Sequence, residues 1–249
     1  MKISETFKDY VRYLFAGRRA EAREAIMAAH DRGTLASKLL KYVIWPAMEE
    51  VEKLYRADHV SRIQEQMATR INRMIADQLQ GYLARKPRSG QRMIVTCGDG
   101  EIEELGAQIT ADLFEAEGWS VWFLGSGVPN DEILQLVGTV KADVLCIYGA
   151  KPVGVPNIRR LVELIRAVGV CDDMQILVTG GVFNRADGLA DEVKVDLYAP
   201  SVEEAMKTVA EHPVRVPKPD VPEPGRRRKR NRKGAQTSAI RKARLALGV

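Results

Sequence analysis

The chain has 249 residues, 45% of them hydrophobic and 29% charged. This composition suits one or two globular domains with hydrophobic cores and excludes fibrous or broadly disordered proteins. No apolar run is as long as a membrane-spanning helix, and the first residues carry charges throughout, so neither membrane insertion nor export is expected. We expect a cytoplasmic protein whose three widely spaced cysteines, Cys97, Cys146 and Cys171, stay reduced rather than forming disulfides or a zinc site.

The net charge of +5 hides a strong asymmetry along the chain. Residues 226 to 249 contain ten lysines and arginines and no acid, which leaves a net charge of −5 on residues 1 to 225. The body of the protein is therefore mildly acidic, and the cationic character is confined to the tail.

The first part of the chain is predicted to be helical. Apolar residues recur at helical spacing over residues 7 to 15 and 22 to 29. Thr34 is expected to cap a third helix that runs to about Ile44. Pro46 then indicates either a continuation as a separate helix or a kink within one longer helix.

The clearest helix start is the capping box from Ser61 to Gln64, in which the two side chains satisfy each other's backbone amides. It precedes a set of apolar residues expected on one face of that helix, namely Ile63, Met67, Ile71, Met74 and Ile75. Four helices joined by short loops predict an antiparallel bundle domain over residues 1 to 85.

After a short polar linker, the pattern changes to five apolar runs, each followed by a helical stretch. The runs are residues 93 to 95, 121 to 124, 144 to 148, 176 to 178 and 195 to 198. Five such units predict an α/β domain over residues 91 to 211, with a flavodoxin-like (Rossmann-like), five-stranded parallel sheet. Ligands in such sheets lie beyond the carboxyl ends of the strands, so the loops at 98 to 106, 148 to 155 and 179 to 184 are expected around one site.

The remaining residues, 212 to 249, are expected to form a proline-rich linker and a disordered basic tail, because residues 213 to 225 hold five of the eleven prolines. Clustered cations without acids can bind nucleic acid in a salt-dependent, sequence-indifferent way, or can contact an acidic protein. The candidate nucleic-acid residues are Arg226, Arg227, Arg228, Lys229, Arg230, Arg232 and Lys233. A merely solubilising tail is the alternative.

The most informative motif is the glycine-rich turn from Gly98 to Gly106, which follows the first predicted strand and leads into a helix. It has the spacing of the acid-x-His-x-x-Gly signature, with Glu101 at the acid, Glu103 in place of the histidine and Gly106 at the glycine. With the strand-end segment Tyr148-Gly149-Ala150 and the pair Gly180-Gly181, this turn makes residues 1 to 211 resemble cobalamin (vitamin B12)-binding proteins with an N-terminal helical bundle. That family includes corrinoid carrier proteins and B12-dependent light-sensing regulators.

A second match lies in the bundle. In light-sensing members an aromatic residue is followed ten residues later by Glu-His, and these cover the upper face of the corrin. Here Tyr55 is followed by Glu65 and Gln66 at that spacing, so the histidine is again replaced. His59, in the loop between them, is a weak alternative cobalt ligand, as is Glu103; no metal site is otherwise predicted.

The resemblance implies that a corrinoid lies between the helical bundle and the sheet. The implied contacts are Tyr55, Glu65, Gln66, Glu101, Glu103, Gly106, Tyr148, Gly149, Gly180 and Gly181. In the family the double glycine lets the nucleotide tail pass close to the backbone, and a serine near position 148 bonds the lower base. A phenol at Tyr148 would occupy space that the lower base needs, which argues against cobalamin in its usual pose.

These residues leave several functions open. We see no catalytic nucleophile arrangement, P-loop or zinc spacing, so no enzyme is expected, and the leading hypothesis is a cobalamin-type sensor or regulatory protein. One alternative is a scaffold that no longer binds cobalamin and acts in protein or nucleic-acid interaction. A further alternative is a corrinoid carrier that passes a methyl group between partner methyltransferases.

Overall fold

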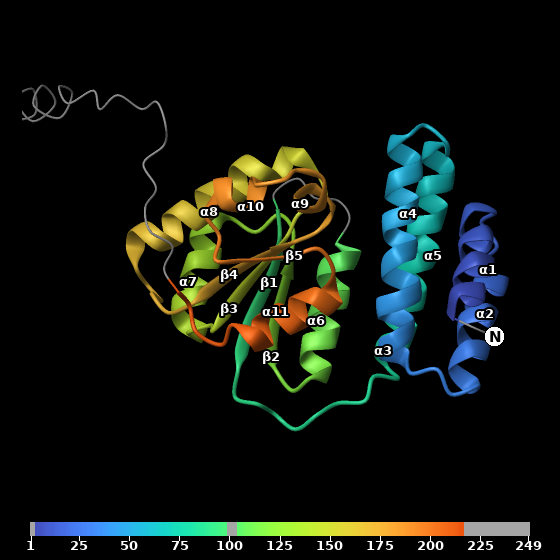
Figure 1. Ribbon diagram of the computed structural model, residues 1–249, viewed down its shortest axis with the longest axis horizontal. Coiled ribbons are helices and arrows are strands. Elements are labelled where there is room, and N and C mark those ends of the chain that lie inside the picture. The colour runs from blue at the N-terminus through green and yellow to red at the C-terminus, as the bar shows by residue number, and fades with distance from the viewer. Residues whose placement is uncertain (1–2, 99–103, 217–249) are drawn as a thin grey trace, which may run out of the picture. The chain divides into compact units, whose positions relative to one another are not determined.

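The computed structural model describes residues 3 to 98 and 104 to 216 (Figure 1). The residues up to Val216 form one compact unit. The predicted basic tail and the acidic part of the glycine-rich turn, with Glu101 and Glu103, lie outside the described residues. Within the described residues, no helix is both long and apolar enough to cross a bilayer.

The first part of the chain is helical, as predicted. Its elements are α1 (Ile3–Phe15), α2 (Arg19–Asp31), α3 (Ala36–Leu39), a π-helical turn (Leu40–Ile44), α4 (Trp45–Arg56) and α5 (Arg62–Gln80). Because α3, the π-helical turn and α4 follow one another without a break, the structure has one longer helix with an irregularity at Pro46. A proline has no amide to donate and clashes with the carbonyl four residues earlier, and the wider π-helical turn relieves both problems.

Two local predictions about helix starts had different outcomes. The capping box is confirmed, since the Gln64 amide donates to Ser61 Oγ at 3.3 Å and the Ser61 amide donates to Gln64 Oε1 at 3.0 Å. The prediction that Thr34 caps α3 is wrong, because Leu35 holds the cap position without a side-chain bond. The Thr34 carbonyl is instead hydrogen-bonded to the His30 ring, at 3.1 Å.

The apolar face predicted for α5 is correct only over its later turns. Ile71 and Ile75 are buried, but Ile63 is 72% exposed and Met67 is 38% exposed. The turn between α1 and α2 reaches only to Met67, whose sulfur lies 3.0 Å from the place of a Cβ on Gly17. Ile63, one helical turn earlier, therefore extends beyond the helices that bury the rest of the face.

A buried polar chain that the sequence did not reveal joins three helical segments in the bundle. The Tyr10 hydroxyl donates to Asn72 Oδ1 at 2.8 Å, and Asn72 Nδ2 donates to the Ile44 carbonyl at 3.2 Å. Burial raises the pKa of Tyr10 well above its ordinary value, so the hydroxyl keeps its proton and remains a donor.

The second part of the chain is the predicted parallel sheet. Its strands are β1 (Arg92–Cys97), β2 (Ser120–Gly125), β3 (Val144–Tyr148), β4 (Gln175–Thr179) and β5 (Leu197–Ala199). They lie in the order β2-β1-β3-β4-β5, and every neighbouring pair is parallel. This is the flavodoxin-like order, so the predicted fold class is confirmed.

The helices that follow the strands cover both faces of the sheet (Figure 1). They are α6 (Leu105–Ala116), α7 (Asn130–Val140), α8 (Val155–Val168), α9 (Gly181–Arg185), α10 (Leu189–Val193) and α11 (Val202–Glu211), with a 3-10 turn at Pro152–Gly154. One hydrophobic core lies between the sheet and α7, α8 and α10. The other lies on the face of α6 and α11 and continues without interruption into the helical bundle.

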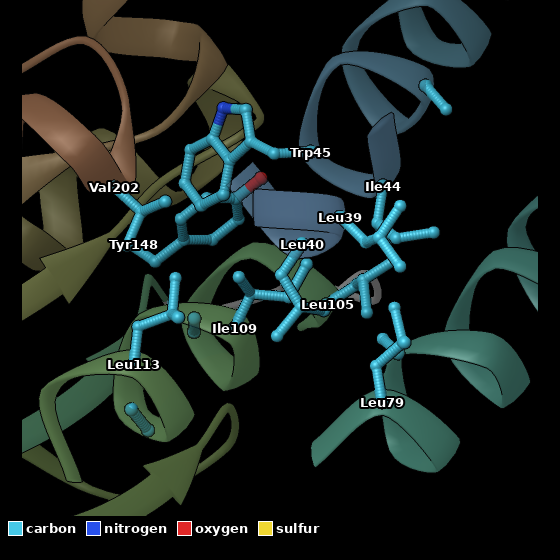
Figure 2. Close-up of a cluster of buried hydrophobic side chains, with 14 of the residues drawn as sticks. Leu39, Leu40, Ile44, Trp45, Leu79, Leu105, Ile109, Leu113, Tyr148 and Val202 are labelled. Atoms are coloured by element: carbon cyan, nitrogen blue, oxygen red, sulfur yellow. The ribbon is translucent and has the colours of Figure 1, made fainter. Parts of the chain in front are cut away.

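That shared core joins the two parts of the chain. Figure 2 shows Leu40 and Ile44, from the π-helical turn, close to Leu105 and Ile109 of α6. All four side chains are at most 1% exposed. Burying apolar side chains of this size contributes roughly 2 kcal/mol each, so the interface between bundle and sheet is a core rather than a loose contact.

The last described residues are held in place, unlike the free spacer predicted from residue 213 onward. Arg215 Nε donates to Asp196 Oδ1 at 2.8 Å, and the other oxygen of Asp196 accepts from Arg166 and from the Ile176 amide. Asp196 therefore ties the residue before β5 to β4, and β5 begins at Leu197, two residues after the predicted Val195.

Candidate ligand site at the carboxyl edge of the sheet

Loops from β1, β3 and β4 meet at the carboxyl edge of the sheet, as predicted. The Gly98 amide donates to the Tyr148 carbonyl at 2.8 Å, and the Gly149 amide donates to the Thr179 carbonyl at 2.9 Å. Gly180 has a φ of 107°, and a Cβ there would lie 2.4 Å from the Gly149 carbonyl oxygen. This glycine is required because two backbones touch, without reference to any ligand.

Helix α4 of the bundle lies against this edge. Trp45, Met48 and Glu52 share one face of the helix through their spacing of three and four residues. The Trp45 and Tyr148 rings meet edge to face with centroids 6.3 Å apart, as Figure 2 shows, and the Tyr148 hydroxyl lies 3.8 Å from the Met48 sulfur. The bundle is thereby in direct contact with the end of β3.

An ion pair extends this contact toward the end of β4. Arg185, in α9, donates to Glu52 at 2.9 Å and to the Ala150 carbonyl at 2.6 Å. Gly181 makes room for the pair, because a Cβ there would lie 2.5 Å from Arg185 Nη1 and 2.8 Å from Glu52 Oε2. Sequence reasoning missed this interface, although the spacing of Trp45, Met48 and Glu52 on one helix could have indicated it.

Tyr148 fills the space above Gly106. The side chain is buried, at 3% exposure. A Cβ on Gly106 would lie 2.3 Å from its Cε2, 2.5 Å from its Cζ and 2.7 Å from its hydroxyl oxygen. Any side chain at position 106 would therefore collide with the tyrosine ring.

Glu104, the described acid of the glycine-rich turn, is bound by a neighbouring loop. Glu104 precedes α6 and turns toward the next loop, where its Oε1 accepts hydrogen bonds from the Ser126 amide and the Ser126 hydroxyl, both at 2.7 Å. The Glu104 carboxylate is therefore held by the loop after β2. Sequence reasoning did not anticipate Ser126 as its partner.

The candidate residues in the bundle lie near the end of the α4–α5 hairpin. Tyr55 is one turn beyond Glu52 on the same face of α4 and is 37% exposed. Gln66 is exposed and donates to Glu65 Oε2 at 2.8 Å. Asp77, three turns later on the same face of α5 as Gln66, accepts a hydrogen bond from Gln108 of α6 at 2.5 Å. Tyr55 and Gln66 thus lie on the same helix faces as Glu52 and Asp77, which contact the α/β part of the chain.

Two of the three histidines of the chain have partners outside the sheet edge. The His30 ring packs on Tyr82 with centroids 4.6 Å apart, and the His212 ring is hydrogen-bonded to the Thr208 carbonyl at 2.9 Å. His59 is exposed in the loop between α4 and α5. Among the described residues, no group of three or more His, Cys, Asp or Glu side chains is arranged to hold a metal ion.

Two carboxyl groups near the bundle have raised pKa values. Burial raises the pKa of Glu49, although its hydrogen bond from Trp45 Nε1 at 3.0 Å acts in the opposite direction. Burial, together with the charges of Glu115 and Asp77, raises the pKa of Asp112 to about 7. Neither group lies among the predicted ligand residues, and both report the desolvation at the interface of bundle and sheet.

Comparison with known proteins identifies both parts of the chain. Two family models, each described as a B12 binding domain, match residues 6–80 and residues 91–210. The chain belongs to the B12-binding-domain proteins. The first model covers the helical bundle and the second covers the α/β domain, so the resemblance noted in the sequence is confirmed.

Relatives of this B12-binding-domain protein span most of the chain. Dimethylamine corrinoid protein 1 of Methanosarcina acetivorans is 21% identical over 194 residues, which are 76% of this chain and 90% of the relative. The trimethylamine corrinoid protein of Methanosarcina barkeri is 25% identical over 193 residues, 76% of this chain and 85% of the relative. The solved monomethylamine corrinoid protein of M. barkeri has a TM-score of 0.76 at 17% identity, and covers 84% of this chain and 99% of its own.

The side chains at the sheet edge do not fit a cobalamin bound as the resemblance implies. By the resemblance, the nucleotide tail would meet position 148 and the pair Gly180-Gly181. Here the first of these places is filled by the Tyr148 ring, and the two glycines are packed against the Gly149 backbone and the Arg185 ion pair. The B12-binding domain of this chain thus has the family fold, and at these positions its own side chains and backbone are packed against one another.

Proposed function

We propose that this protein is a non-catalytic corrinoid-binding component that presents a corrinoid to a partner protein, as a carrier does for a methyltransferase. The corrinoid is held between the helical bundle and the carboxyl edge of the sheet, with no protein imidazole on cobalt. The single observation that carries the proposal is the seating of α4 on that edge through Trp45, Met48 and Glu52. Helix α4 and the strand ends thereby form the two sides of one ligand-binding region.

The proposal assigns the ring of the corrinoid to residues beyond this contact. Tyr55 offers a partly exposed aromatic face on α4, and Gln66 offers an exposed amide on α5. Glu65, Glu101 and Glu103 complete the proposed set. A flat apolar macrocycle with amide side chains is bound by such a combination of aromatic contact and polar groups.

Kinship supports the carrier role over the regulatory one. The relatives that span most of this chain are named as methylamine corrinoid proteins. The sensor role predicted from the sequence stays a prediction, as do the cytoplasmic location and nucleic-acid binding by the basic tail.

The test is direct binding. Purified protein is mixed with hydroxocobalamin, methylcobalamin or adenosylcobalamin and passed through a desalting column. A visible corrinoid spectrum that elutes with the protein is expected, and colourless protein in all three mixtures would refute the proposal. Tyr55→Ala is expected to weaken binding by about tenfold, which corresponds to about 1.4 kcal/mol. Tyr82→Ala, which removes another exposed tyrosine, serves as the matched control and should bind like the wild type.

A second candidate is a ligand-free scaffold, favoured by the buried ring of Tyr148. In that case the bundle and the sheet serve only to present surfaces and the basic tail to a partner. Removal of residues 226 to 249 would then abolish retention on heparin, whereas the body alone, with its net charge of −5, would not bind. A truncated protein that is still retained would contradict this candidate.

A further inference from the structure

The side chain of Tyr148 takes the place of a ligand group. It stands at the carboxyl end of β3 and is enclosed by Gly106 of α6 on one side and by Trp45 and Met48 of α4 on the other. Figure 2 shows the ring beside Trp45, with Val202 and Leu113 of the same core near it. The ring is therefore a component of the core that joins the two domains.

The contact between Tyr148 and Gly106 is a matched pair of large and small residues. A Cβ at 106 would lie 2.3 to 2.7 Å from three atoms of the phenol, so the tyrosine can occupy this place only if residue 106 is glycine. In the resemblance, position 148 is where a side chain bonds the lower base of the nucleotide tail. The space that the glycine provides is real, and the chain fills it with its own aromatic ring.

The surrounding contacts close the same space from outside. Glu52 and Arg185 pair at 2.9 Å, with their side chains about 28% and 27% exposed, and Arg185 also binds the Ala150 carbonyl. Gly180 lies against the Gly149 backbone with no room for an added carbon atom. A chain of ligand atoms that entered here would have to displace a ring, an ion pair and a backbone contact together.

The absence of a histidine beside Tyr148 is consistent with the filled space above Gly106. In free cobalamin the benzimidazole of the nucleotide tail coordinates cobalt, and a protein imidazole can take its place. No histidine is among the residues that enclose Tyr148, and His30 and His212 have other partners. When the base stays on cobalt, the tail remains folded under the ring and needs no channel in the protein.

We propose that Tyr148 is a built-in plug of the nucleotide-tail channel, so that this chain binds corrinoids with their own base still on cobalt and recognises the ring alone. This inference rests on the proposed function for its ligand, but the plug itself is a property of the protein. Its consequence is a relaxed specificity: corrinoids that differ in the lower base, or lack it, bind alike.

The first experiment tests the plug without any corrinoid. Tyr148→Gly in the full chain removes the ring, and p-cresol, the free form of that side chain, is added while the melting temperature is measured. We expect p-cresol to raise the melting temperature of this variant and to leave the wild type unchanged. Ile75→Ala, which destabilises the bundle core without opening an aromatic space, is the control and should not respond. Equal responses in all three proteins would overturn the plug.

The second experiment tests specificity by equilibrium dialysis with cobalamin and with cobinamide, which lacks the nucleotide tail. The wild type should bind both with affinities within about threefold, and bound cobalamin should keep its base-on spectrum. Tyr148→Ser should shift the preference toward cobalamin by at least about tenfold. A wild type that prefers cobalamin tenfold and converts it to the base-off form would overturn the proposal.

The two failures are distinguishable. A wild type that binds neither compound refutes the proposed function, and the p-cresol measurement then decides the plug by itself. If Tyr148→Ser gains cobalamin binding that the wild type lacks, the plug is supported and the protein is the scaffold that the second candidate describes.

Discussion

The packing of Tyr148 on Gly106 predicts an unusual response to a mild substitution. Gly106 is the second residue of α6, and its φ is not positive, so alanine fits its backbone. In a helix interior, glycine to alanine alone stabilises by about 0.8 kcal/mol. At this place the new methyl group would lie 2.3 Å from the buried ring, and overpacking of a core costs about 1–3 kcal/mol.

The expected net effect of Gly106→Ala is therefore a loss of about 1–2 kcal/mol in the free energy of unfolding, or a fall of several degrees in melting temperature. The reason is specific to the tyrosine, and so it can be isolated with a double-mutant cycle. Tyr148→Ala alone should cost about 3–5 kcal/mol because it leaves a cavity. When both changes are combined, the methyl group enters that cavity. The double mutant should therefore lose about 2 kcal/mol less unfolding free energy than the two single mutants together.

Urea unfolding followed by circular dichroism, with equal slopes for all four proteins, is the assay. Gly138→Ala, within α7, is the matched control: its methyl group would meet only one side-chain methyl, of the 40%-exposed Val170. That variant should lie near the wild type. If Gly106→Ala proves neutral or stabilising, or if the double mutant is additive, the ring does not occupy the space above Gly106 and the reasoning fails.

Three further predictions concern charged groups. Asp196→Asn should cost about 3 kcal/mol in unfolding free energy, because Arg166 and Arg215 lose the charge of their nearly buried partner. The pKa of Asp112 is raised from 3.8 to about 7 in the folded protein, so the free energy of unfolding should fall as pH rises between these values. Asp112→Asn should flatten that fall when urea unfolding is measured across the range. Arg185→Met should cost about 1–2 kcal/mol in thermal unfolding, since Glu52 loses its partner at the interface.

Each of these three has a control of the same chemical kind. Asp9→Asn breaks an exposed pair on α1 and should change stability by less than about 0.5 kcal/mol. Glu163→Gln, on the exposed side of α8, should leave the pH slope unchanged, and an equal flattening there would remove Asp112 as its cause. Arg56→Met removes the other, more exposed partner of Glu52, at 3.5 Å, and a loss as large as that of Arg185→Met would contradict the role given to the interface.

Much of the fold could be predicted because it depends on local patterns. The five apolar runs, each followed by a helix, gave the strand positions to within two residues at most ends, and the capping box gave the start of α5. The errors occurred where a distant contact decides a local feature. Ile63 follows the apolar period of its helix, but no helix reaches that far to bury it.

The candidate site divides in the same way. Its place at the carboxyl edge followed from the topology, and the conflict at Tyr148 followed from its residue type. The contacts of Glu104 with Ser126, and of Glu52 with Arg185, could not be predicted, because they join side chains 22 and 133 positions apart. Sequence patterns predict the helix or turn in which Glu52 and Glu104 lie, but they do not predict the side chain that each one contacts.

Residue order alone was sufficient to reveal a helical bundle ahead of a parallel sheet, with glycines at a strand-end site and no imidazole among its motifs. Such features follow from periodicity and from single positions in the chain. Whether the space beside Gly106 is open or filled depended on bringing α4, α6 and the end of β3 together, because a volume is defined only by the surfaces that enclose it. The folded chain encloses that volume around its own tyrosine ring.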